Sequence, residues 1–283
     1  MPGLQPSMMK QLAKLAFKAH AIQLPVNWKQ PSADPDKKQY PDAFKPSERS
    51  TVPDPSKLFL PATVNKYHTD SVKTVSGNFE KYIDGITAAI CSGIDMWRLQ
   101  AKFKDLKIMA VSAIGAPGCL DGPELKSLIL MSAPMSTAQE QKYSKAIAGH
   151  VSEAWKKWQD KVTVPGLPWY PAFAAFPSPQ APPMPNVPTP LIACPSPMMS
   201  EMTPEQLKKG MIDKLGESDA QHHKELFDSI AKAVGALFLA WLPQQQVMLV
   251  MGKGPVPTFA PPYVPVGPVV GGDNIAVPGH LAA

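Results

Sequence analysis

Three segments of this chain repeat one spacing that is typical of a buried helix face. Residues 82–97, 143–158 and 226–241 each place an isoleucine eleven residues before a tryptophan. Because eleven residues span close to three turns of an α-helix, the two side chains lie on the same face. The sequence therefore predicts three helices with paired structural anchors. These anchors are Ile86 and Trp97, Ile147 and Trp158, and Ile230 and Trp241.

The residues after each tryptophan are also alike, because a short β-like run is followed by Gly and Pro. This pattern predicts an α+β fold of three short helix–strand units, formed by triplication of one unit or by convergence. Three ordinary amphipathic helices are the alternative. We expect an amphipathic N-terminal helix in residues 1–22, an extended Pro-rich arm in 23–75, a first unit in 76–135, a second unit with a Pro-rich strap in 136–200, a helix pair and third unit in 201–254, and a Pro/Gly-rich tail in 255–283.

Proline and charge set the character of the segments outside the helices. The chain has 34 prolines, and only 18% of its residues are charged, against about 25% in a typical domain. Because proline lacks an N–H donor, these segments favour extended arms over a large regular sheet. Aromatic side chains in the arms need cover, on a partner or on the chain's own body, although residues 23–65 could also form a mobile linker. The predicted partner-docking residues are Trp28, Tyr40, Phe59, Trp169, Tyr170, Phe173 and Phe176.

Residues 6–20 form a short amphipathic pattern with lysines on one face. The apolar face is predicted to hold Met8, Leu12, Leu15 and Ala16, and the lysines are Lys10, Lys14 and Lys18. Three functions compete for this helix: docking on a partner protein, binding a membrane surface and contacting nucleic acid. Packing on its own body is the structural alternative. The lysines also interrupt any secretory signal, and Pro243 with the glutamines after it divides residues 233–251, the best candidate membrane span.

No arrangement of residues in the sequence predicts catalysis, a cofactor site or a metal site. The three cysteines are far apart and form no CxxC pair, which argues against zinc. Ser112 lacks the flanking glycine of a nucleophile elbow. Residues 252–254 (GKG) lack the remainder of a phosphate loop and are expected to form a hairpin turn. His222 and His223 are expected at a solvated helix end. The net charge of +5 comes mainly from the first seventy-odd residues, but these lack the dense Lys/Arg clusters with interleaved aromatic residues that favour nucleic acid.

The three Pro-rich segments, residues 23–65, 165–197 and 255–283, resemble in composition the arms of minor structural proteins of tailed-phage virions and phage-tail-like contractile injection particles. The resemblance implies a non-enzymatic structural protein that is made in the cytoplasm and assembled into a particle. Its expected partners are other copies of itself, as a symmetric homo-oligomer, and other structural subunits. The alternative is a membrane-active or secreted effector that uses the basic N-terminal helix and residues 233–251.

Overall fold

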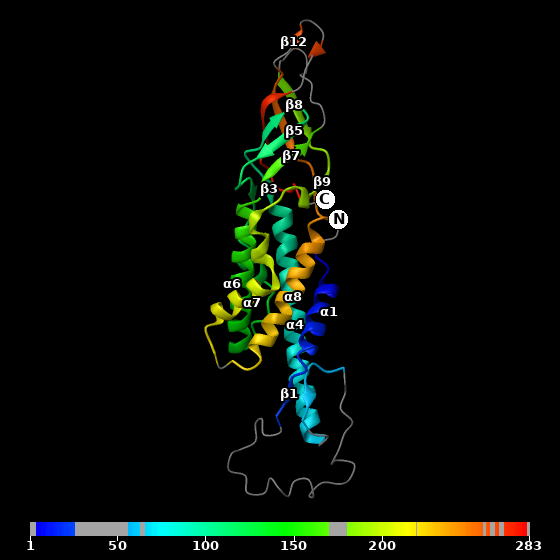
Figure 1. Ribbon diagram of the computed structural model, residues 1–283, viewed down its shortest axis with the longest axis vertical. Helices are drawn as coiled ribbons and strands as arrows, with labels where there is room; N and C mark the ends of the chain where they lie inside the picture. The colour runs from blue at the N-terminus through cyan, green and yellow to red at the C-terminus, as the bar shows by residue number, and fades with distance from the viewer. Residues whose placement is uncertain are drawn as a thin grey trace, which may run out of the picture.

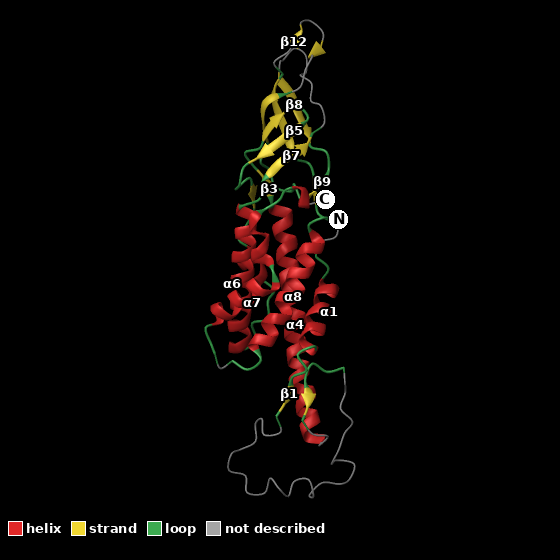
Figure 2. Ribbon diagram, viewed as in Figure 1, coloured by secondary structure: helices red, strands yellow, loops and turns green. Residues whose placement is uncertain are grey.

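The computed structural model describes residues 4–25, 56–62, 66–169, 180–218, 220–256, 259–260, 264–265 and 269–281. The molecule is elongated, with a long helical body and a smaller region of strands at one end (Figure 1). Most of the strands lie beyond one end of the helices, and one short pair of strands lies beside the helices near the opposite end (Figure 2). The predicted α+β class is confirmed.

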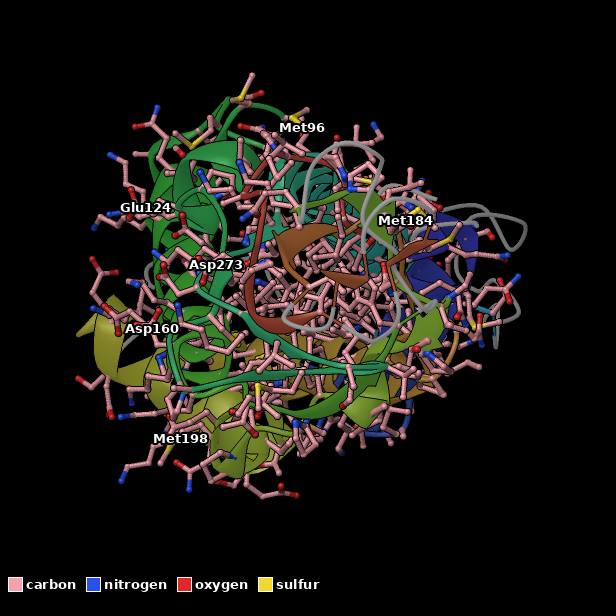
Figure 3. All side chains as sticks on the ribbon, turned by 90° about the horizontal axis from the view of Figure 1, so that it is seen from above. Met96, Glu124, Asp160, Met184, Met198 and Asp273 are labelled. Atoms are coloured by element: carbon pink, nitrogen blue, oxygen red, sulfur yellow. The ribbon has the colours of Figure 1, made fainter. Side chains whose placement is uncertain are left out.

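Three long helices and three shorter ones form a ring around the long axis. The long helices are α4 (Lys66–Gln100), α6 (Ala138–Asp160) and α8 (His223–Trp241), and the shorter ones are α1 (Pro6–Lys18), α5 (Leu125–Leu130) and α7 (Pro204–Leu215). A shorter helix stands between each two long ones, because α5 contacts α4 and α6, α7 contacts α6 and α8, and α1 contacts α8 and α4. Figure 3 shows this ring from above, along the long axis. Two short 3-10 helices, η1 (Leu191–Ala193) and η2 (Pro197–Met202), precede α7.

Local sequence explains where two of these helices begin and end. The Thr137 hydroxyl caps the backbone N–H of Glu140, and the Glu140 carboxylate accepts from the backbone N–H of Thr137. This capping box satisfies two N–H groups that have no partner within the helix, and it lies where the spacing predicts. Helix α7 begins at Pro204, which fits the first turn, and ends at Gly216 in the left-handed conformation, with φ 66°.

The strands after all three long helices join one six-stranded sheet. Helix α4 is followed by β4 (Lys107–Met109) and β5 (Ser112–Gly115), α6 by β7 (Val164–Pro168) and β8 (Gln180–Pro185), and α8 by β11 (Met251–Pro255) and β14 (Val270–Asn274). Their order in the sheet is β7-β5-β4-β14-β11-β8. Each pairing between strands that follow different helices is antiparallel and contains one register shift.

Four short strand pairs complete the described strands. They are β1 (Gln23–Leu24) with β2 (Leu60–Pro61), β3 (Lys102–Phe103) with β6 (Leu120–Asp121), β9 (Thr189–Pro190) with β10 (Gln246–Val247), and β12 (Phe259–Ala260) with β13 (Val264–Pro265). The β12–β13 pair lies at the extreme end of the molecule, beyond the six-stranded sheet (Figure 1).

The two edge strands of the sheet meet, so that the sheet curls into a small barrel. Trp169, directly after β7, forms a β-bridge with Asn186, directly after β8. The Val187 N–H donates to the Pro168 carbonyl over 2.9 Å, and the indole N–H of Trp169 donates to the Met184 carbonyl over 3.0 Å. Closure of this kind leaves fewer strand edges open to another chain.

Glycine makes room inside this barrel. A Cβ atom on Gly252 would lie 2.1 Å from Ile108 Cδ1 and 2.8 Å from Trp169 Cζ2, and one on Gly254 would lie 2.5 Å from the Cα of Gly272. Both glycines lie in β11, so the prediction of a hairpin turn at residues 252–254 is wrong. The two glycines, which suggested a turn, are instead needed for close packing of the strands.

The described parts of two Pro-rich segments belong to the chain's own sheet. Strands β7 and β8 lie in the predicted strap. The last residue of β11 and the whole of β14 lie in the predicted tail. For the strap, cover by the chain's own body is therefore the alternative that the structure shows, and the expectation that the described parts of both segments dock on neighbouring subunits is corrected. Proline is tolerated because the strands are short and their pairings irregular. Most of the predicted arm, residues 26–55, lies outside the described residues.

Helix α1 packs on the body with a different face from the predicted one. Its buried residues are Met9, Ala13 and Phe17, whereas Met8 and Leu15 are 48% and 64% exposed. The helix contacts α8 and α4. The sequence offers two apolar stripes of similar width, and packing against the neighbouring helices selects the one with Phe17.

Candidate functional site

A cavity of about 1020 Å³ opens at the end of the helical body that faces away from the barrel. We call it the axial pocket, because all three long helices or the turns before them line it. Its lining residues are Asn78, Phe79, Lys81, Tyr82, Thr137, Gln139, Glu140, Lys142, Tyr143, Gly216, Glu217, Ser218, Ala220, Gln221, His222 and Leu226.

Corresponding positions of the three long helices line this pocket. Counted from the isoleucine anchors, Tyr82, Tyr143 and Leu226 each stand four residues earlier, and all three are buried. Eight residues before the anchors stand Asn78, Gln139 and His222, which also line the pocket. The pocket therefore has an apolar floor with hydrogen-bonding side chains above it, contributed from three directions.

Aromatic contacts hold the floor in place. The rings of Tyr82 and Tyr143 have centroids 6.1 Å apart, and Tyr143 lies 5.7 Å from Phe227. The Tyr82 hydroxyl lies 3.2 Å from Ser144 Oγ, which donates to the Pro134 carbonyl over 2.7 Å. Burial raises the pKa of both tyrosines, so they stay neutral and act as hydrogen-bonding groups.

The wall of the pocket carries both signs of charge. Lys142 forms an ion pair with Glu217. His222 stacks edge-on against Phe59, with centroids 5.1 Å apart, and burial lowers the pKa of its imidazole. Both His222 and His223 are thus partly or fully covered, which corrects the expectation of a solvated pair. The mixed charge suits a protein surface better than a single strong anion or cation.

The interactions described at the pocket include no activated nucleophile. Ser144, a buried hydroxyl in contact with Tyr82 of the pocket floor, donates its proton to a backbone carbonyl, and its other neighbour is a neutral tyrosine. Within the described residues, no three His, Cys, Asp or Glu side chains lie in a group that could hold a metal ion.

A second polar cluster, around Asp228, joins three helices. Its carboxylate accepts from Lys208 of α7 over 2.9 Å and from Lys232 of α8 over 2.7 Å, and it lies 3.1 Å from His20 after α1. Burial alone would raise the pKa of Asp228, but the hydrogen bonds from Lys232 and Lys208 outweigh burial and lower it. We interpret this cluster as a structural link, because Asp228 and its partners come from α8, α7 and the end of α1, which pack together in the ring.

The six predicted anchors all lie in the core. Each isoleucine is fully buried, and the three tryptophans are at most 3% exposed. Spacing did not single out Trp155, whose ring stands between those of Trp97, Trp158, Phe238 and Trp241 at centroid distances of 4.9 to 5.6 Å. This cluster lies at the C-terminal ends of α6 and α8, next to the barrel.

Two of the predicted docking residues are covered by their own chain. Phe59 is fully buried, and its ring centroid lies 5.3 Å from that of Phe17 and 5.0 Å from that of Phe79. Trp169 is 3% exposed and fills the barrel. The expectation that these two dock on a partner is therefore corrected. The other five, Trp28, Tyr40, Tyr170, Phe173 and Phe176, lie outside the described residues.

No family model, curated protein or solved structure matches this chain. Among the described residues, no helix is both long enough and apolar enough to cross a membrane. The function must therefore be argued from the geometry of the chain itself.

Proposed function

We propose that this chain is a non-enzymatic structural component of a multi-subunit particle, of the virion or tail-like kind. It is made in the cytoplasm and contributes three related units around one axis. Each unit is a shorter helix, a long helix and a pair of strands. The function is to join other structural subunits at the axial pocket, along that axis.

The order of contacts supports three related units. In the helical ring, each shorter helix lies between its own long helix and that of the preceding unit, with α1 closing the circle against α8. In the sheet, the first strand of each unit pairs with the last strand of the unit before it. Three unrelated helices would not be expected to follow the same cyclic order of units in both the helical ring and the sheet.

Short matching segments after the strands give a further argument. Residues 117–120 read PGCL and residues 278–281 read PGHL. The Cys119 carbonyl accepts from the Lys104 N–H over 2.8 Å, and the His280 carbonyl accepts from the Met248 N–H over 2.9 Å. In the second unit the Pro195 carbonyl accepts from the Thr163 N–H over 2.9 Å. Each bond returns the chain to the segment that leaves a long helix.

The observation that carries the proposal is the threefold lining of the axial pocket. Three floor positions and three upper positions come from corresponding places on the three helices. A partner built from three identical chains can place the same group against each of them, which a single asymmetric ligand cannot do. The proposed partner at this end is therefore a threefold-symmetric subunit.

Self-association, which the sequence predicts, is a second form of the same function. It is favoured less, because the described strands already close on themselves within one chain. Residues 26–55, part of the predicted arm, would reach neighbouring subunits in either form. The effector alternative has less support, since Met9, Ala13 and Phe17 of α1 and most of the apolar residues of α8 are buried.

Site-specific photo-crosslinking tests this proposal in the cells that make the chain. A benzophenone amino acid is placed at Asn78, Gln139 or Gln221, all exposed at the pocket, and at Leu239 as an exposed control on α8. The three pocket positions should crosslink to the same protein, and Leu239 should not. Crosslinks to different proteins from the three positions, or none from any of them, would contradict the proposal.

A further inference from the structure

The end of the molecule opposite the axial pocket is free of charge over three separate runs of sequence. Residues 108–120, 162–200 and 254–272 contain no Asp, Glu, Lys, Arg or His. Each run includes strands of the six-stranded sheet: β5 in the first, β7 and β8 in the second, and parts of β11 and β14 in the third. The fold therefore gathers these strands of the three uncharged runs at one end, although they are far apart in the sequence.

The charges of the sheet stop at its helix-facing end. Lys107 and Lys253 both stand opposite Asp273 in the strand register, and Lys107 forms an ion pair with it at 2.5 Å. Beyond this level the paired residues are Met109 with Val270, Ser112 with Pro168, and Pro255 with Gln180. The β12–β13 pair, within the third run, lies farther still along the long axis (Figure 1).

Exposed apolar side chains accompany this lack of charge. Met109, Val111 and Val270 are 50%, 53% and 43% exposed, although the interior of the barrel is filled by other residues such as Ile108 and Trp169. These three side chains face outward from the end of a closed sheet. Nothing in the core of the chain requires them to be apolar.

We propose that this uncharged end inserts into the interfacial region of a lipid bilayer. A protein-binding surface loses charge at its centre but keeps a polar, charged rim. Here every described strand residue of the three runs is uncharged, exposed ones included, which entry into lipid demands and a protein partner does not. The paired strands also satisfy much of their backbone within the sheet, as a lipid environment requires. Since the runs carry no cation, the driving force is burial of apolar groups and not attraction to anionic headgroups.

This proposal goes beyond the structural role and concerns the opposite end of the chain from the axial pocket. It also differs from the effector alternative, whose membrane-binding surfaces are α1 and residues 233–251. A protein partner at the uncharged end is the competing explanation, and the experiment below separates the two.

An environment-sensitive dye on introduced cysteines tests the insertion and its depth. The native thiols of Cys91, Cys119 and Cys194 are buried, and burial raises their pKa to about 12, 11 and 12, so they should not take up the dye. The full chain carries the dye at Ala260→Cys in β12, at Val111→Cys on the barrel, or at Met131→Cys on the helical body. The probe is a vesicle of phosphatidylcholine alone.

The proposal predicts a blue shift of the dye at position 260, a smaller or absent shift at 111 and no shift at 131. Added salt should leave the shift unchanged. In unlabelled chain, Ala260→Lys should weaken vesicle binding by about tenfold or more, whereas Met131→Lys, an equally conservative lysine at a 71% exposed position, should not.

Three results would overturn the proposal. They are no binding of the native chain to these vesicles, binding that disappears in salt, and equal shifts at positions 260 and 131. If Ala260→Lys instead abolished assembly while vesicles bound nothing, the uncharged end would be a protein-binding surface. None of these results depends on crosslinking at the axial pocket, so the two proposals can fail separately.

Discussion

Trp155→Ala should be among the most destabilising single substitutions in this chain. The side chain is 1% exposed, and its ring has four aromatic neighbours, Trp97, Trp158, Phe238 and Trp241. Truncating a buried Trp to Ala costs about 3–5 kcal/mol, and each lost aromatic pair adds roughly 0.5–1.5 kcal/mol beyond area. The indole N–H is buried without a hydrogen-bond partner in the described residues, so its removal returns about 1 kcal/mol. With about 0.5 kcal/mol for each of the four pairs, we therefore expect a loss of about 4–6 kcal/mol.

Urea unfolding followed by circular dichroism measures this loss. Trp155→Phe keeps a ring and removes the unpartnered N–H, and we expect it to cost less than half as much. Leu239→Ala, at a 59% exposed position, serves as the surface control and should change stability by no more than about 0.5 kcal/mol. The double variant with Trp97→Ala should be non-additive by about 1 kcal/mol, because the two rings are in contact. A loss below about 1 kcal/mol for Trp155→Ala would refute the description of this cluster as the centre of the core.

Three further predictions concern the barrel, the C-terminal segment and one helix start. Gly252→Ala should lower the melting temperature, because the new Cβ would lie 2.1 Å from Ile108 Cδ1. The control Gly149→Ala in α6 meets no atom within 4 Å and should raise stability by roughly 0.5–1 kcal/mol. A higher melting temperature for Gly252→Ala than for Gly149→Ala would contradict the barrel packing. Burial lowers the pKa of His280 from 6.5 to about 4, so between these values the unfolded chain binds a proton that the folded chain does not, and stability should fall as pH falls through this window. His280→Phe should flatten that pH dependence in urea titrations, and an unchanged slope would show that another group causes it. Thr137→Ala should cost about 1 kcal/mol by loss of the capping box, and Ser136→Ala, one residue earlier, is the control that should not.

The sequence predicted the helical anchors well because their signal is local. Ile and Trp eleven residues apart identify one helix face regardless of what packs on it. Helix α1 shows the limit of this reasoning, because its two apolar stripes differ little in sequence and contacts with α4 and α8 select between them. Phe59 shows another limit. An isolated aromatic residue in a Pro-rich stretch looks the same in the sequence whether a partner or its own chain covers it.

The barrel could not be predicted, because its strands are short and pair across long distances in the sequence. Lys107 pairs with Asp273, and no local periodicity connects them. The axial pocket was missed for a different reason. The residues that line it were visible in the repeated spacing, but nothing local indicated that they meet. The positions four and eight residues before each isoleucine anchor were already aligned by the spacing, but the sequence alone does not show that they converge on one cavity.

The stoichiometry of the complex formed at the axial pocket tests the account most directly. Native mass spectrometry of the chain, purified with the protein that crosslinks at Asn78, Gln139 and Gln221, counts the copies of each component. Three related units around one axis predict one copy of this chain with three copies of the partner. A complex of one chain with one partner chain, or a particle in which three copies of this chain surround a single partner, would contradict it.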